Sequence, residues 1–177
     1  MSASELTRTI KARHLPADPV VIDANDTERA ALAKRFGIPR VDMLHAEISL
    51  DKDGKAVRAE GTLTAKLVQN CAISGEEFEV AVEEPVAMRF VEEGTIDPAL
   101  EEGDEIEIEL SSDDLDEIEY AGESFDLGEA IAQSLGLAID PYAEGPDADA
   151  VRKSAGITSD DAPRGALAEA LAALKKD

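Results

Sequence analysis

Apolar side chains recur at every second position through the middle of the chain. One alternating run covers residues 44–50, a second follows the turn sequence DKDGK and covers 57–67, and a third covers 78–90. A period of two is typical of strands that bury one face. The sequence therefore predicts a three-stranded antiparallel meander, with Gly61 as a bulge or bend and Pro85 as a break.

Helical spacing appears on either side of this meander. The sequence DANDTERAALAKRFGIP predicts a helix over about 27–36, with Asn25, Asp26 or Thr27 as its N-cap. A second helix is expected from Asp126, where Asp-x-x-Glu resembles a capping box, to near Ile139, just before Pro141. Residues 6–14 alternate loosely and suggest a short edge strand.

These elements predict an α+β fold, in which an antiparallel meander that can curl towards a barrel packs against two helices. Residues 1–142 form one domain in this interpretation. Residues 92–104 are expected to be a loop, and DEIEIEL at 104–110 a strand with an anionic outer face. Few large apolar residues occur over 143–161, so we expect residues 143–177 to be a flexible linker and a short C-terminal helix.

The negative charge is concentrated in one block. Residues 75–129 hold 22 acidic side chains and one basic side chain, Arg89, in a protein of net charge −23. Such a field repels phosphate backbones and favours a basic partner, although a solvated, solubilising surface explains the composition more simply. The candidate partner-binding face consists of acids from the predicted strand and the residues after it: Glu105, Glu107, Glu109, Asp113 and Asp114.

Basic side chains near the N-terminus offer an alternative. The predicted edge strand and first helix carry the candidates for direct RNA binding, which are Arg8, Lys11, Arg13 and Arg35. Scattered surface charge is the simpler explanation of this set, because the aromatic side chains that stack on RNA bases are scarce.

Other chemistries find little support. The single cysteine, Cys71, excludes an internal disulfide and a multi-cysteine zinc site. It also has no positive side chain close in sequence to lower its pKa. No catalytic motif or phosphate-binding loop is recognisable, so we expect neither an enzyme nor a cofactor. No apolar run is long enough to span a membrane and the N-terminus lacks a signal peptide, which predicts a cytoplasmic protein.

Four segments together resemble the YceD family, and most closely its alphaproteobacterial branch. They are LTRTIKA, TERAALAKRFGIP, GTLTAKLVQNCAISGEEFEV and FDLGEAIAQSLGLAIDPY. Many members carry a second cysteine where this chain has Ser74, so a metal or redox role is not transferable. The most specific positions are Gln69, Cys71, Asp126, Leu127, Gly128, Glu129 and Pro141.

The resemblance implies a non-enzymatic role in accumulation of the large-subunit (23S) ribosomal RNA. Combined with the charge distribution, it leads to one hypothesis. A monomeric protein binds a basic large-subunit ribosomal protein or assembly factor through its acidic face, and contacts rRNA indirectly or weakly. The alternative hypothesis is a direct rRNA-binding module built on the N-terminal basic residues.

Overall fold

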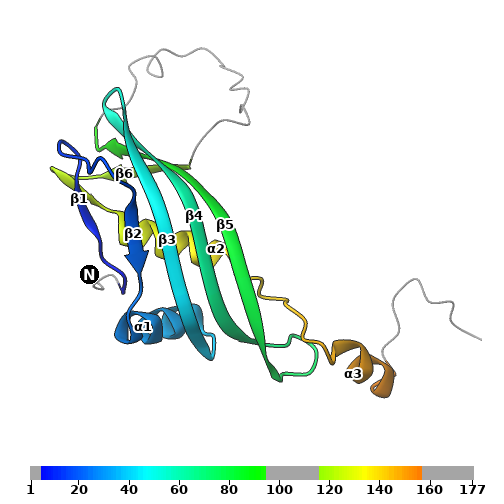
Figure 1. The fold of residues 1–177 in the computed structure, drawn as a ribbon. Coiled ribbons are helices and arrows are strands. Elements are labelled where there is room, and N and C mark those ends of the chain that lie inside the picture. The colour runs from blue at the N-terminus through cyan, green and yellow to red at the C-terminus, as the bar shows by residue number, and fades with distance from the viewer. Residues whose placement is uncertain (1–4, 95–115, 157–177) are drawn as a thin grey trace, which may run out of the picture.

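The computed structural model describes residues 5–94 and 116–156 (Figure 1). Its strands and helices follow the chain in the order β1 (Thr9–Lys11), β2 (Val20–Asp23), α1 (Asp26–Phe36), β3 (Arg40–Asp53), β4 (Ala56–Asn70), β5 (Glu77–Glu92), β6 (Asp116–Tyr120), β7 (Ser124–Asp126), α2 (Leu127–Ala138) and α3 (Ala148–Ser154). The α+β class is therefore confirmed.

The main sheet has five strands in the order β2-β3-β4-β5-β6. The meander β3-β4-β5 is antiparallel, as the alternation predicts, whereas β6 joins β5 in parallel. Strands β2 and β6 are the edges of this sheet, so the described strands do not close into a barrel. Strands β1 and β7 pair separately as a two-stranded sheet.

Two details of the predicted meander are wrong. The pairing of β4 with β5 runs without interruption through Gly61 and Pro85, so neither residue is a bulge or a break. The register shift lies instead in β3, between Val41 and Met43. Gly61 is needed for a different reason, since a Cβ there would overlap the carbonyl oxygen of Glu47 on the neighbouring strand.

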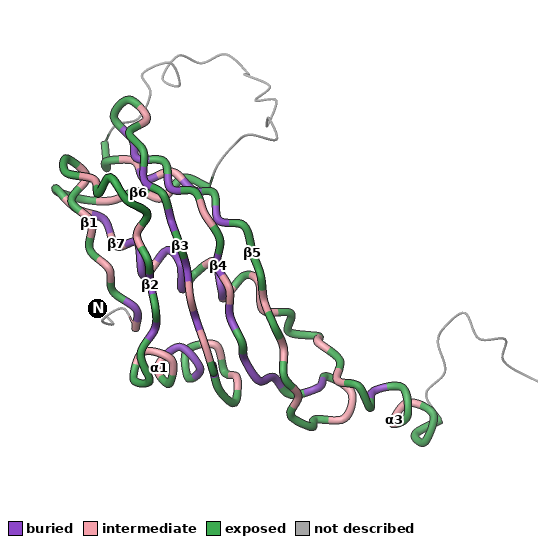
Figure 2. Tube along the Cα trace, in the orientation of Figure 1, coloured by how far each residue is buried: buried purple, intermediate pink, exposed green. Residues whose placement is uncertain are grey.

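Helix α2 lies behind the main sheet in the view of Figure 1 and contributes the largest buried helical face. Its Leu127, Ile131 and Leu135 are fully buried in the core with the inward side chains of β3, β4 and β5. Figure 2 shows buried residues along β3 and β4. Phe90 of β5 stacks on Phe125 of β7 with ring centroids 4.1 Å apart. The core is thus mostly aliphatic, as the scarcity of aromatic residues requires.

The start of α2 is bound to the N-terminal segment. The Asp126 Oδ1 atom accepts hydrogen bonds from the backbone N–H groups of Gly128, Glu129 and Arg8, the last at 2.7 Å. The N–H of Leu127 donates to the carbonyl of Arg8 at 3.0 Å. A Cβ on Gly128 would lie 2.8 Å from the Arg8 nitrogen, so only glycine allows this close approach.

The helix caps are close to those predicted. Asn25 is the N-cap of α1, with Glu28 completing a capping box, and Ile139 is the C-cap of α2. Helix α3 lies within the expected linker, where its Ala148 is buried. The predicted strand at 104–110, most of the predicted loop at 92–104 and the predicted C-terminal helix lie outside the described residues.

We predict that Gly61→Ala destabilises the protein by about 2–3 kcal/mol, because the new methyl group must displace backbone atoms of β3. Urea denaturation measures the change. Thr62→Ala is the control, since Thr62 is the adjacent, exposed residue of β4. Equal stability of the two variants would contradict the close approach.

Asp126→Ala removes the acceptor of three N–H groups and is expected to cost about 2–3 kcal/mol of unfolding free energy. Asp126→Asn keeps an acceptor oxygen at the same place and should lose less than about 1 kcal/mol. Thermal denaturation of both variants tests the assignment, which fails if asparagine is as damaging as alanine.

Candidate functional site

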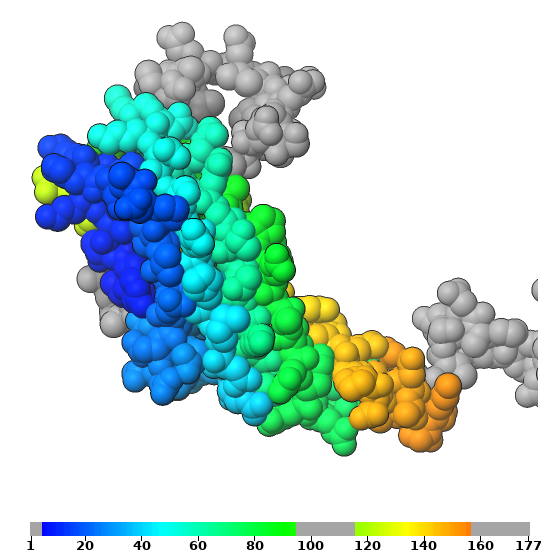
Figure 3. Space-filling model, in the orientation of Figure 1, coloured from blue at the N-terminus to red at the C-terminus, as the bar shows by residue number. Residues whose placement is uncertain are grey.

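The side of the main sheet opposite α2 is open. Outward side chains of β3, β4 and β5 form a continuous surface in Figure 3, and no described helix covers it. The outward positions of β5 carry mainly small and acidic residues, among which Glu79, Glu83 and Ala87 are all exposed. This face and the neighbouring strand β6 contain most of the described acidic side chains of the acidic block.

Most of these carboxylates have no basic partner. Arg89, the one base of the block, donates to Glu117 at 2.7 Å and lies within ion-pair distance of Asp53. Of the exposed acids of the block that form no ion pair with another described residue, Glu92 and Glu123 line the pocket described below. The other eight define what we call the anionic strip: Glu76, Glu77, Glu79, Glu83, Glu84, Glu93, Asp116 and Glu119. The strip follows β5 and continues onto β6.

Part of the strip lies on a free strand edge. Strand β6 pairs only with the last five residues of β5, from Met88 to Glu92. Within the described part of the chain, residues 77–87 therefore form an edge of the sheet. Its glutamates and Pro85 oppose pairing with another neutral or acidic strand, while the same carboxylates attract positive charge.

The five acids predicted as the partner-binding face, Glu105 to Asp114, lie outside the described residues. The described residues on both sides of that segment belong to the anionic strip, with Glu93 before it and Asp116 after it. The prediction for these five acids is not tested by the structure.

Two of the four predicted RNA-binding residues hold the fold together. Arg8 forms an ion pair with Glu28 at 2.7 Å, and Arg35 forms ion pairs with Glu129 at 2.8 Å and Glu5 at 3.0 Å. The hydrogen bond from Arg8 lowers the pKa of Glu28, and the Glu28 carboxylate in turn raises the pKa of Arg8. Lys11 and Arg13 are exposed. The structure therefore leaves only these two of the four available to a partner.

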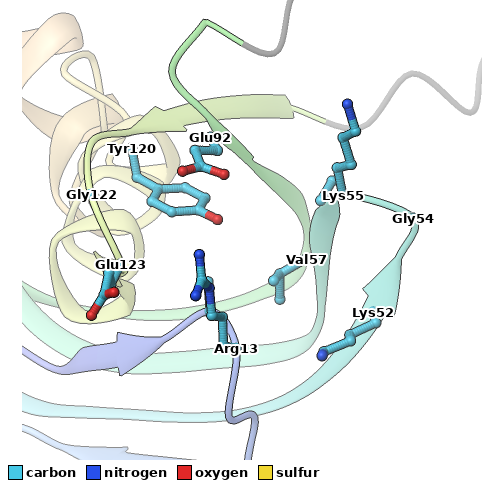
Figure 4. A pocket seen from close by; sticks show the side chains of 11 residues that line it. Arg13, Lys52, Gly54, Lys55, Val57, Glu92, Tyr120, Gly122 and Glu123 are labelled. Atoms are coloured by element: carbon cyan, nitrogen blue, oxygen red, sulfur yellow. The ribbon is translucent and has the colours of Figure 1, made fainter.

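Arg13 lines a pocket of about 170 Å³, which lies at the end of the sheet where β5, β6 and the β3–β4 turn meet (Figure 4). It is also lined by Lys52 of β3, Lys55 of the turn, Glu92 of β5, Tyr120 of β6 and Glu123. Burial and the nearby Glu92 raise the pKa of Tyr120, while Arg13 opposes this rise. Sequence reasoning missed this group because its members come from separate segments.

The positions that resemble the YceD family are mainly structural. Gln69 is buried and donates from Nε2 to the carbonyl of Asp140 at 2.8 Å, which fixes the chain after α2 to β4. Asp126, Leu127 and Gly128 form the junction with the N-terminal segment. Glu129 pairs with Arg35, whereas Pro141 is exposed.

Cys71 follows β4 and is only 3 % exposed, beneath the chain segment that contains Gly145. Its Sγ accepts hydrogen bonds from the N–H groups of Ile73 and Ser74, each at 3.4 Å. Hydrogen bonding by the Ser74 side chain and these backbone groups lowers the pKa of Cys71 to about 7. No positive side chain causes this shift, in agreement with the sequence, because hydrogen bonds stabilise the thiolate instead.

Within residues 5–94 and 116–156, no three histidine, cysteine, aspartate or glutamate side chains are grouped as metal ligands. Over the same ranges, no helix is long and apolar enough to cross a membrane.

We predict that the Cys71 thiol titrates with a midpoint of about 7, which the ultraviolet absorbance of the thiolate measures. Because the pKa in the folded protein lies below its ordinary value of 9.0, this group adds stability as pH rises from about 7 towards 9 and loses it as pH falls through about 7. Ser74→Ala should move the midpoint upward, whereas Ser49→Ala, on the open face, should not. An unshifted midpoint in Ser74→Ala would contradict the assignment.

Residues 59–175, more than half of the chain, match the model of a protein family described as "Large ribosomal RNA subunit accumulation protein YceD". No curated protein and no solved structure matches the chain.

Proposed function

The chain belongs to the YceD family, and we propose that it acts in 23S rRNA accumulation as a non-enzymatic binding protein. The description of the family names accumulation of the large ribosomal RNA subunit. Its partner in this proposal is a basic large-subunit ribosomal protein or assembly factor. The anionic strip and the neighbouring acids Glu105, Glu107, Glu109, Asp113 and Asp114 contact that partner.

The main support for this proposal is the excess of exposed carboxylates on β5 and β6 that have no described basic partner. Charges of one sign gathered on one surface raise the association rate of an oppositely charged protein and reject partners of like sign. Ribosomal proteins are basic because they bind RNA, which makes them complementary to such a surface. The open sheet face offers room for a folded partner.

A mechanism follows from competition between polyanions. A basic protein bound to the strip is kept from non-specific contacts with nucleic acid. Because the charge of rRNA is much denser, rRNA then takes the basic protein from the strip. Assembly then remains productive, and rRNA that is packaged correctly accumulates. The protein itself needs no catalytic group for this role.

The alternative, direct rRNA binding through Arg8, Lys11, Arg13 and Arg35, has weaker support. Arg8 and Arg35 are engaged in ion pairs that join the N-terminal segment, α1 and α2. Using them for RNA would break contacts that hold these elements together. Lys11 and Arg13 are the two that remain exposed.

We expect the double variant Glu79→Lys with Glu83→Lys to bind its basic partner at least about tenfold more weakly, because each reversal replaces an attractive contact by a repulsive one. The control is Asp18→Lys with Asp51→Lys, which changes the net charge equally at exposed acids outside the acidic block. The measurement is a titration against purified large-subunit ribosomal proteins at two salt concentrations.

A second variant, in which Glu105, Glu107 and Glu109 are changed to Lys, tests the predicted face in the same assay. Added salt should weaken binding of the unmutated protein, since exposed charges are screened over about 8 Å at physiological ionic strength. Binding that ignores salt and both sets of reversals would reject the electrostatic mechanism.

A further inference from the structure

Arg13 differs from the other described arginines. Seven of the eight arginines in residues 5–94 and 116–156 form an ion pair with a described carboxylate, and Arg13 is the eighth. The others are Arg8, Arg29, Arg35, Arg40, Arg58, Arg89 and Arg152. A guanidinium that lacks a carboxylate partner in a strongly acidic protein is available for an external anion.

The surroundings of Arg13 form a pocket with both signs of charge. In Figure 4, Arg13 extends towards the Tyr120 ring, and the Glu92 carboxylate lies beside that ring. Lys52 comes from the end of β3 on the opposite side, and Lys55 of the β3–β4 turn points outward at the rim. None of Arg13, Lys52 and Lys55 forms an ion pair with a described residue, so the three bases are not neutralised within this part of the chain.

The size of the pocket limits its ligand. The pocket has a volume of about 170 Å³ and is open to solvent on one side. It can therefore hold a small polar group such as a phosphate, while the rest of the ligand lies at its mouth.

We propose that this pocket binds the sugar-phosphate unit of a ribonucleotide, either free or as part of an RNA strand. Arg13 and Lys52 donate to the phosphate oxygens, for which the planar fork of arginine is well suited. The carboxylates of Glu92 and Glu123 accept hydrogen bonds from sugar hydroxyls, which a bare anion does not offer. The apolar side chain of Val57 forms part of the wall.

This site goes beyond the proposed function, because its charge is suited to an anion and the anionic strip is suited to a basic protein. The net charge of the chain repels a long polyanion more strongly than a single nucleotide. At physiological ionic strength, screening over about 8 Å confines that repulsion to nearby carboxylates. A short probe is therefore the more sensitive test of the pocket itself.

The experiment is a titration of the full-length protein, followed by amide chemical shifts, with three probes. They are uridine monophosphate, its 2′-deoxy analogue and a short single-stranded oligouridylate. We expect shifts centred on the pocket, at Gly54 and Gly122, and a loss of affinity of about tenfold or more in Arg13→Ala. Arg13→Lys should bind with intermediate affinity, because it keeps the charge and loses the fork.

Lys34→Ala is the matched control, since Lys34 is an exposed base on α1 outside the pocket. Arg13-dependent binding of the mononucleotide alone identifies a free nucleotide as the ligand, and tighter binding of the oligouridylate identifies an RNA strand. Equal binding of the deoxy analogue would overturn the role given to the two carboxylates. No Arg13-dependent binding of any probe would overturn the proposal, whatever the outcome with basic proteins.

Discussion

The Asp126 carboxylate holds the two ends of the described domain together. One of its oxygens accepts N–H groups from the first turn of α2 and from Arg8, which is 118 residues away in sequence. The Arg8 side chain in turn reaches Glu28, which also accepts the N–H of Asn25 at the start of α1. These hydrogen bonds fix the positions of α1, the N-terminal segment and α2 relative to one another, in addition to the apolar contacts of the core.

The same arrangement determines which charges remain for a partner. The bases near the junction are committed to internal carboxylates, as Arg35 is to Glu129 and Glu5. The acids of β5 and β6 outnumber the single base among them, so their field is directed into solvent. A surface charge of one sign is therefore a consequence of where the fold uses its arginines, and not only of overall composition.

The sequence was informative where structure is locally determined. Period two identified β3, β4 and β5, and capping residues located α1 and α2, because these signals act over a few residues. Strands β1, β2, β6 and β7 have three to five residues each. Of these, only β1 was expected, since such strands are stabilised by partners that local pattern does not reveal. The acidic character of β5 could be predicted, whereas the pocket around Arg13 required the tertiary structure.

Two proposed contacts of opposite sign meet at the β6 end of the sheet, where Glu92 lines the pocket and the adjacent Glu93 belongs to the anionic strip. A basic protein on the strip would neutralise carboxylates beside the pocket and so favour phosphate binding at Arg13. Thermodynamic linkage requires the reverse effect to be equal, so a ribonucleotide in the pocket would strengthen binding of the basic partner. The two sites would then cooperate, although the free anionic strip repels a ribonucleotide and the bases of the empty pocket repel a basic protein.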